Sequence, residues 1–305
     1  MRAFHRLLIY AMLVLGSITF LVPLLWMIST GLKPIDQTMS MPPRWLPYRL
    51  YVQKNGALTE IKPSEVNHYP PGQIIKKISP RWGNFAAAIH AMKHFPLYLE
   101  NTLILCVLTV LGTVVSSALA AYGFARVDWP GRNQVFLLAL ATMMVPFPVT
   151  MVPVYCLFRW LGWIGTLKPL WVGSFFAGAF NVFLLRQFFM TIPKDLSEAA
   201  RIDGCGELRI FWQIVLPLCK PALMVVGLFQ FMYTWNDFMG PLIYLTNEKD
   251  YTLALGLQAF QSQHGGTEWH YLMAASTLVA LPIIVLFFFT QKTFIEGISM
   301  TGIKG

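Results

Sequence analysis

The chain has 305 residues, of which 56% are hydrophobic and only 12% are charged, and its formal net charge is +9 at pH 7. An average soluble domain is about one quarter charged, so this composition argues against a soluble enzyme. The apolar residues stand in long blocks, a pattern that is typical of a polytopic membrane protein. The basic excess then suits anionic lipid headgroups better than nucleic acid.

Six apolar blocks are each long enough to cross a bilayer, whose hydrocarbon core of about 30 Å needs about 20 helical residues. The remaining segments leave no room for a separate soluble enzyme, so the sequence predicts one transmembrane domain over residues 1–305. The first block is longer than a signal peptide core and no A-x-A-like site follows it, so we expect a retained anchor. The blocks are Leu7–Ile28, Asn101–Ala125, Gln134–Phe158, Leu167–Phe189, Pro221–Leu245 and Tyr271–Lys292.

The distribution of lysine and arginine predicts the orientation. An even number of spans puts both termini on one side, and most basic residues of the short segments lie on that side. The long segment from Ser29 to Glu100 is also basic, but long loops translocate largely regardless of charge. We therefore expect both termini in the cytoplasm and the long loop outside.

The long external loop contains a hairpin signal and a helix signal. Asn55-Gly56 stands between β-prone runs in YRLYVQKNGALTEI, Tyr48 to Ile61, which predicts a β-hairpin. Apolar residues at helical spacing predict a short surface helix over Asn84–Phe95. We expect an external insertion over about residues 41–96 that carries this small hairpin.

Two spans have unusual composition. Gly112, Ser116 and Ala120 recur every four residues in the second block, and small residues at this spacing let transmembrane helices pack closely. The third block contains Pro146 and two further prolines, so we expect it to be kinked or broken. Such breaks survive only against protein or a watery cavity. A mobile helix along the transport path and a static kink both fit this pattern.

No catalytic constellation is recognisable in the sequence. It lacks the GxxxxGK[ST] phosphate loop. His90 and His94 are four residues apart, but HAMKH lacks the glutamate of the H-E-x-x-H zinc motif, so surface histidines are the simpler interpretation. His264 and His270 flank a glycine pair without a further ligand. We therefore expect no catalytic residue, no metal site and no cofactor in this chain.

Asn236 and Asp237 form a polar pair inside the fifth block. A carboxylate within a span is costly, by roughly 2.5–3.5 kcal/mol on insertion scales, so it should face the bundle interior or water. Two interpretations stay open: the pair bonds or caps a neighbouring helix near the interface, or it contributes to a translocation path.

A polar segment separates the fourth and fifth blocks. Asp195 and Glu198 have the spacing of a capping box, and Gly204 fits the left-handed stop of a helix. The sequence thus predicts a short helix over Asp195–Asp203, which is too short to be stable alone in water. Its exposed face would be small alanines edged by Glu198 and Arg201, and such a face suits insertion into a cleft.

The rest of the polar segment is predicted to be a second helix, running to Pro217. Its apolar residues have helical spacing, which predicts an amphipathic helix at the membrane interface. These residues are Leu208, Phe211, Trp212 and Val215.

A signature spans both predicted helices. Glu198-Ala199-Ala200 is followed after three residues by Gly204, after nine more by Ile214, and after one more by Leu216-Pro217. This pattern matches, at every named position, the EAA signature of binding-protein-dependent ABC importer permeases. FLLRQFFMTIPKDLSEAARIDG, YTWNDFMGPL and the tail ending GIKG further resemble carbohydrate importer permeases, namely the maltose-type second permease subunit. The resemblance departs at about Tyr48 to Pro80, where an insertion replaces a short connection.

This resemblance implies an all-α, six-helix bundle of the type I importer permease (MetI-like) class with a small external β-hairpin insertion. It implies a subunit that translocates a sugar or oligosaccharide by alternating access. The implied partners are a homologous permease, two ATPase subunits that bind ATP and Mg, and an extracytoplasmic solute-binding protein. The implied location is the plasma (inner) membrane of a prokaryote.

The resemblance also implies site residues. The short helix, within a cytoplasmic loop over residues 190–220, would be the coupling helix that docks on an ATPase, and the cytoplasmic tail over 293–305 would reach between the ATPases. The docking residues would be Glu198, Ala199, Ala200, Arg201, Asp203 and Gly204, the tail contacts Lys304 and Gly305, and the loop touching the binding protein Gln263, His264, Gly265 and Gly266.

Alternative functions follow from the same observations. An importer for another polar solute, such as a glycerol phosphate ester, belongs to the same class. A proton-coupled secondary carrier using Asp237 belongs to a different class, and the EAA signature argues against it because a carrier has no ATPase to dock. A membrane enzyme is a third alternative, for which no constellation was found.

Overall fold

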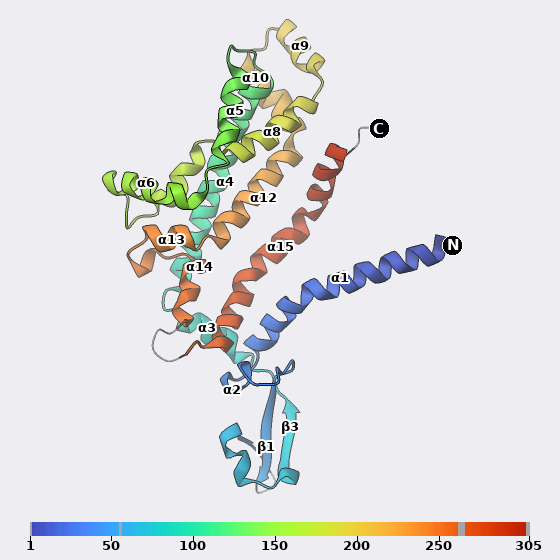
Figure 1. The fold of residues 1–305 in the computed structure, drawn as a ribbon, viewed down its shortest axis with the longest axis vertical. Coiled ribbons are helices and arrows are strands. Elements are labelled where there is room, and N and C mark those ends of the chain that lie inside the picture. The colour runs from blue at the N-terminus through green and yellow to red at the C-terminus, as the bar shows by residue number, and fades with distance from the viewer. Residues whose placement is uncertain (1, 55–56, 262–265, 303–305) are drawn as a thin grey trace. The chain divides into compact units, whose positions relative to one another are not determined.

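The computed structural model describes residues 2–54, 57–261 and 266–302 of the chain. The described part is mainly helical, with one small antiparallel sheet (Figure 1). Among these residues, four helices are long and apolar enough to cross a membrane, and the number reaches six if each of two bent helix pairs counts as one span. This agrees with the predicted all-α membrane protein.

The chain divides into two compact units. Unit 1 comprises Met1–Phe95 and Gly256–Ile284, and unit 2 comprises Pro96–Leu255 and Val285–Gly305. The last helix, α15 (Trp269–Gly302), contributes to both units. The candidate functional site belongs to unit 2.

Unit 1 contains the apolar helix α1 and a three-stranded sheet with order β2-β1-β3, in which both pairings are antiparallel. The register pairs Lys54 with Ala57, which confirms the strands of the predicted hairpin, whereas its turn at Asn55-Gly56 lies outside the described residues. The prediction missed β3, whose IIKKI run does not alternate apolar and polar residues. The elements are α1 (Arg2–Gly31), α2 (Ile35–Thr38), β1 (Tyr48–Lys54), β2 (Ala57–Ile61), η1 (Pro63–His68), η2 (Pro71–Gln73), β3 (Ile74–Ile78), α3 (Gly83–Ala91) and η6 (Leu257–Phe260).

Buried contacts fix the end of α1 inside unit 1. The Asn84 amide, at the start of α3, donates hydrogen bonds to the carbonyls of Gly31 and Lys33, both at 2.9 Å. The Lys33 ammonium is buried 3.8 Å from the centroid of the Trp26 ring, and desolvation by burial lowers the pKa of Lys33. A Cβ at residue 31 would lie 3.0 Å from the backbone of Ala274, so glycine permits this close approach of α1 and α15.

Unit 2 contains the remaining helices, and several spans in it are broken. The axes of α5 and α6 differ by 97°, and Pro146 stands at the break as the N-cap of α6, so the break predicted in the third block is confirmed. A second bend of 80° separates α10–α11 from α12. The elements are α4 (Phe95–Ala125), α5 (Arg132–Thr142), α6 (Phe147–Trp160), α7 (Lys168–Trp171), η3 (Val172–Phe175), α8 (Ala179–Thr191), α9 (Lys194–Ile202), α10 (Glu207–Ile210), η4 (Phe211–Val215), α11 (Leu216–Leu218), α12 (Lys220–Asn236), α13 (Met239–Tyr244), η5 (Glu248–Asp250) and α14 (Leu253–Gly256).

The fourth block has a break that the sequence did not reveal, and small residues of α4 accommodate it. The Ser116 hydroxyl accepts a hydrogen bond from the Ala177 N–H and donates one to the Ser174 carbonyl, both at 3.1 Å. A Cβ at Gly112 would come within 2.6 Å of the Phe175 ring. Gly112 therefore allows close approach, and Ser116 satisfies two backbone groups that lipid would leave unpaired.

The apolar core of unit 2 surrounds the end of α4 that lies beside α9. It joins residues of α4, α5, α8, α9, η4 and α12 in one cluster, so the short helix α9 rests on a packed base. The buried members are Ala118, Ala121, Tyr122, Phe136, Val182, Leu185, Phe189, Ile192, Ala200, Ile210, Phe211, Val215, Cys219, Ala222 and Val226.

Candidate functional site

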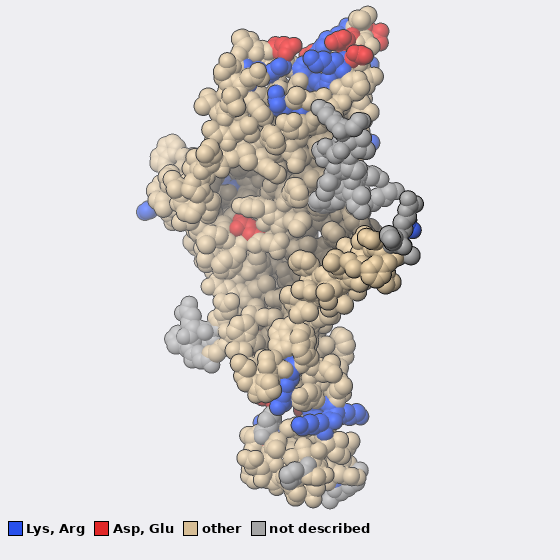
Figure 2. All heavy atoms as spheres, turned by 45° about the vertical axis from the view of Figure 1, so that its right-hand side comes forward, with Lys and Arg blue, Asp and Glu red and all other residues tan. Residues whose placement is uncertain are grey.

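The EAA signature runs from α9 through η4 to α11, at the end of unit 2 where charged side chains gather (Figure 2). The observed α9, Lys194–Ile202, lies within one residue of the predicted helix. Its N-cap is Pro193 and no side chain caps it, so the predicted capping box of Asp195 and Glu198 is wrong. Pro193 precedes the first helical residue instead. Asp195 falls in the first turn, where its negative charge interacts favourably with the positive end of the helix dipole.

The end of α9 has the predicted left-handed stop. Gly204 has φ +80°, its N–H donates to the Arg201 carbonyl at 3.0 Å, and the Cys205 N–H donates to the Ala200 carbonyl at 2.9 Å. This pair of bonds is a Schellman motif, which satisfies carbonyls at the helix end. The motif turns the chain sharply into α10.

The two alanines of the signature face opposite ways. Ala200 is 8% exposed and belongs to the core of unit 2, and Ser197 beside it is also buried. Glu198, Ala199 and the residues from 201 to 204 are exposed. The expectation that both alanines face outward is therefore wrong for Ala200, because α9 must bury one face to be stable.

A large apolar side chain completes the outer face of α9. Ile202 is 87% exposed, and Leu196 is also exposed. Leu196, Ala199 and Ile202 are spaced three residues apart, so they form one stripe along the helix, called here the α9 stripe. Sequence reasoning missed Ile202, although its spacing from Ala199 was a usable signal.

Hydrogen bonds from Tyr122, in the last turn of α4, and from Arg126, the residue that follows α4, hold the chain on both sides of α9. The Arg126 guanidinium donates to the carbonyls of Phe189 at 2.6 Å and Ile192 at 2.5 Å, at the end of α8 and just before α9. After α9, the Glu207 carboxylate accepts from the Arg201 guanidinium at 2.8 Å and from the Tyr122 hydroxyl at 2.5 Å.

The predicted amphipathic helix after Gly204 is observed as the continuous run of α10, η4 and α11, in which η4 is a π-helical turn. Phe211 and Val215 are buried in the core, whereas Leu208 and Trp212 are exposed. The four apolar residues therefore form two faces rather than one, because each pair is spaced four residues apart.

Asp237 lies at a break in the fifth block. Helix α12 ends at Asn236, and the Asp237 carboxylate accepts a hydrogen bond from the Gly240 N–H at 3.0 Å, in the first turn of α13. The exposed Asn236 amide donates to the Met232 carbonyl at 2.7 Å. This geometry matches the interpretation in which the carboxylate bonds a helix terminus.

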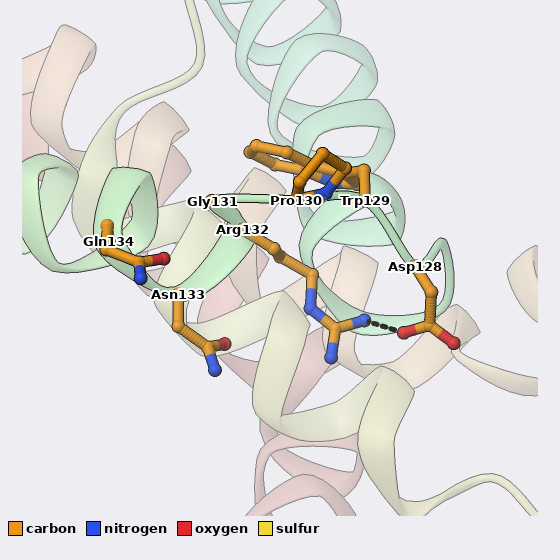
Figure 3. Close-up of a pocket in the computed structure, with 7 residues that line it drawn as sticks. All are labelled: Asp128, Trp129, Pro130, Gly131, Arg132, Asn133 and Gln134. Carbon is orange, nitrogen blue, oxygen red and sulfur yellow. Dashed lines mark hydrogen bonds and ion pairs between the residues drawn. The ribbon is translucent and has the colours of Figure 1, made fainter.

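The remaining predicted site residues belong to the loop before α15 and to the C-terminal tail. Gln263, His264, Gly265, Lys304 and Gly305 lie outside the described residues, and Gly266 is exposed with φ +125°. Within the described ranges, no group of three or more His, Cys, Asp or Glu side chains could hold a metal ion. A hollow near α5 is lined by the consecutive residues 128–134, in which Arg132 binds Asp128 at 2.6 Å (Figure 3). One turn lines this hollow, so it does not form a converging catalytic site.

Long apolar helices, some of them paired across sharp bends, define a membrane-spanning protein, and unit 2 carries a short polar helix, α9, at one end. The chain belongs to the family of binding-protein-dependent transport system inner membrane components, whose model matches residues 102–299.

Individual relatives agree with this assignment. The arabinooligosaccharides transport system permease AraQ of Bacillus subtilis (strain 168) is 37% identical over 67% of this chain and 72% of its own length. The trehalose/maltose transport system permease MalG of Thermococcus litoralis is 33% identical over 70% of this chain and 77% of its own. A chain of a crystallised bacterial ABC transporter for the acidic polysaccharide alginate has the same fold, with a TM-score of 0.75 at 19% identity over 95% of this chain and 96% of that one.

Proposed function

We propose that the chain is the permease subunit of an ATP-driven importer for a sugar or oligosaccharide, and that α9 is its coupling helix. The carrying observation is the family match over residues 102–299, which includes an exposed α9 with the EAA signature. The relatives named for arabino-oligosaccharides and for trehalose and maltose support a carbohydrate substrate.

In this proposal the α9 stripe enters an apolar cleft on an ATPase partner. Its apolar members would supply buried area, and the exposed Glu198, Arg201 and Asp203 with Gly204 would form the polar rim. Ala200 does not contact the partner in this proposal; it packs α9 against the core of this chain, in which it is buried.

The same proposal assigns the other subunits of the transporter. A homologous second permease completes the pathway, two ATPase subunits bind ATP and Mg, and a solute-binding protein delivers the substrate. Both termini lie in the cytoplasm, where Lys304 and Gly305 contact the ATPases, and the loop at 263–266 contacts the binding protein. Asn236 and Asp237 stand at the break between α12 and α13, and in this proposal the break borders the translocation path while the Asp237 carboxylate bonds the start of α13. The chain itself performs no covalent chemistry.

The test is solute uptake into proteoliposomes that contain the whole transporter. Arabinotriose, maltose and glycerol 3-phosphate would be offered with the binding protein, with ATP or a non-hydrolysable analogue inside. The proposal expects uptake of a sugar. This uptake should require ATP hydrolysis and should continue when a proton ionophore is added. Uptake of glycerol 3-phosphate alone would overturn the carbohydrate assignment, and uptake that a proton gradient drives without ATP would overturn the importer class.

A further inference from the structure

The Glu207 carboxylate connects two elements through its two oxygens. Oε1 accepts from the Nε–H of Arg201, in the last turn of α9, and Oε2 accepts from the hydroxyl of Tyr122, near the end of α4. Tyr122, Glu207 and Arg201 are called here the clasp. Its ion pair bridges the residues before and after the Schellman turn, and its Tyr122 bond connects the turn to α4.

The solvent exposure of the clasp argues against a role in stability alone. The side chains of Arg201 and Glu207 are 41% and 43% exposed, and half-exposed ion pairs typically stabilise proteins little. The third member is different: Tyr122 is buried, and its ring lies 5.1 Å from the ring of Phe211. The clasp therefore joins a solvent-facing turn to a rigid point inside the core.

Arg126 bonds the chain on the other side of α9. It lies just after the end of α4, one helical turn beyond Tyr122, and binds the Phe189 and Ile192 carbonyls before α9 begins. Tyr122 in α4 and Arg126 directly after it thus hold the chain on both sides of α9. A displacement of α9 relative to α4 would break these bonds, so α9 and this end of α4 should move together.

The far half of α4 is bonded to a different part of unit 2. The Asn101 amide donates to the carbonyls of Lys249 at 2.9 Å and Tyr251 at 3.1 Å, and the Thr102 hydroxyl accepts from the Leu253 N–H at 2.9 Å. Between the two ends, α4 is a continuous helix of 31 residues, which spans roughly 46 Å at 1.5 Å per residue.

We propose that the clasp and α4 form a transmission element, in which Glu207 and Tyr122 are positioning residues that carry the movement of α9 to the segment around Lys249. This inference rests on the proposed function, because the movement of α9 comes from the ATPase partner. It assigns a role to Glu207 and Tyr122, neither of which belongs to the docking face.

The test uses the whole transporter in proteoliposomes and needs no substrate. Lys249→Cys supplies a thiol at an exposed position, in a background with Cys156→Ser and Cys205→Ser. The rate of labelling by a charged maleimide is measured with and without ATP and vanadate. In this background we expect trapping to change the rate about fivefold or more, as is typical of coupled sites.

Tyr122→Phe removes one oxygen atom, and Glu207→Gln removes the charge. Both variants should keep the ATPase subunits, basal hydrolysis and the thermal stability of the complex, but lose most of the ATP-dependent change at residue 249. Their double variant should be no worse than either single variant, because both changes open the same clasp. Arg209→Gln is the matched control, since Arg209 bonds Gln213 outside the clasp at 2.9 Å.

Several outcomes would overturn the inference: a full response in both clasp variants, no response in the parent background, equal loss in Arg209→Gln, or loss of the ATPase subunits in Tyr122→Phe. The last result would make the clasp a structural contact only. Failure of the proposed function is distinguishable, because the unmodified transporter would then show no ATP-dependent uptake of any solute.

Discussion

Ala199 and Ala200 are neighbours in α9, yet Ala200 is buried in the core of its own chain and Ala199 is exposed beside Ile202. One alanine therefore serves the packing of α9, and the other leaves room for a partner. This difference separates the effects of substitutions that look equivalent in the sequence.

Arginine at the two alanine positions should have different consequences. Ala200→Arg forces a charged chain into a packed core, where overpacking and an unpaired charge each cost on the order of 1–3 kcal/mol or more, so the permease itself should lose thermal stability. Ala199→Arg should leave that stability unchanged and release the ATPase subunits. Thermal unfolding of the detergent-solubilised permease pair, with co-purification of the ATPases, separates the two. Equal loss of stability in both variants would contradict the assigned faces.

Gly204→Val should loosen the turn after α9. A residue with a Cβ in the left-handed region costs roughly 1–2 kcal/mol, and no atom lies within 4 Å of the position of that Cβ, so the penalty is conformational and not steric. Gly204→Asn should be milder, because asparagine tolerates this region. Gly206→Ala is the control, with φ −73° and open space around its Cβ position. The readout is hydrogen exchange of the Cys205 amide, and unchanged protection in Gly204→Val would refute the prediction.

Asp237 should act through its hydrogen bond to α13. Asp237→Asn keeps an acceptor oxygen for the Gly240 N–H and should retain most uptake. Asp237→Leu leaves that N–H unpaired inside the membrane domain, at a cost of about 1–3 kcal/mol, and should lower the stability of the complex and its transport rate. Uptake and thermal unfolding of both variants provide the measurement. Wild-type behaviour of the leucine variant would mean that the bond is dispensable.

The sheet of unit 1 should serve an interaction and not membrane insertion. Replacement of Leu50 to Lys77 by a short glycine linker removes most of β1 and β3 and all of β2. We expect normal membrane insertion with weaker association of the binding protein or of the second permease. Binding of the loaded binding protein to reconstituted transporter is the assay, and unchanged association and uptake would show that the sheet is not used.

The sequence was sufficient for features that depend on composition and local spacing. Apolar blocks identified the spans, Pro146 identified a break, and Gly204 identified a helix stop, because each acts through a local constraint on the chain. The short helix was also predicted to expose its alanines, and this holds for Ala199 but not for Ala200.

Features that depend on tertiary packing were not predictable. The burial of Ala200 depends on residues of α4, α8 and η4 that form the core beneath it. The break in the fourth block depends on Ser116 of another helix, which supplies the missing hydrogen bonds. The bond between Tyr122 and Glu207 joins residues 85 positions apart, and no local pattern encodes such a pair.

The most direct test of the central claim is a single polar substitution in the α9 stripe. Ile202→Asp puts a carboxylate where the proposal requires apolar contact, and burial of an unpaired carboxylate is strongly unfavourable, whereas Ile202→Val keeps the apolar surface. Co-purification of the ATPase subunits with the permease pair is the measurement. We expect Ile202→Val to retain them and Ile202→Asp to lose them, at unchanged thermal stability of the permease pair. Full retention of the ATPases in Ile202→Asp would contradict the assignment of α9 as the docking element.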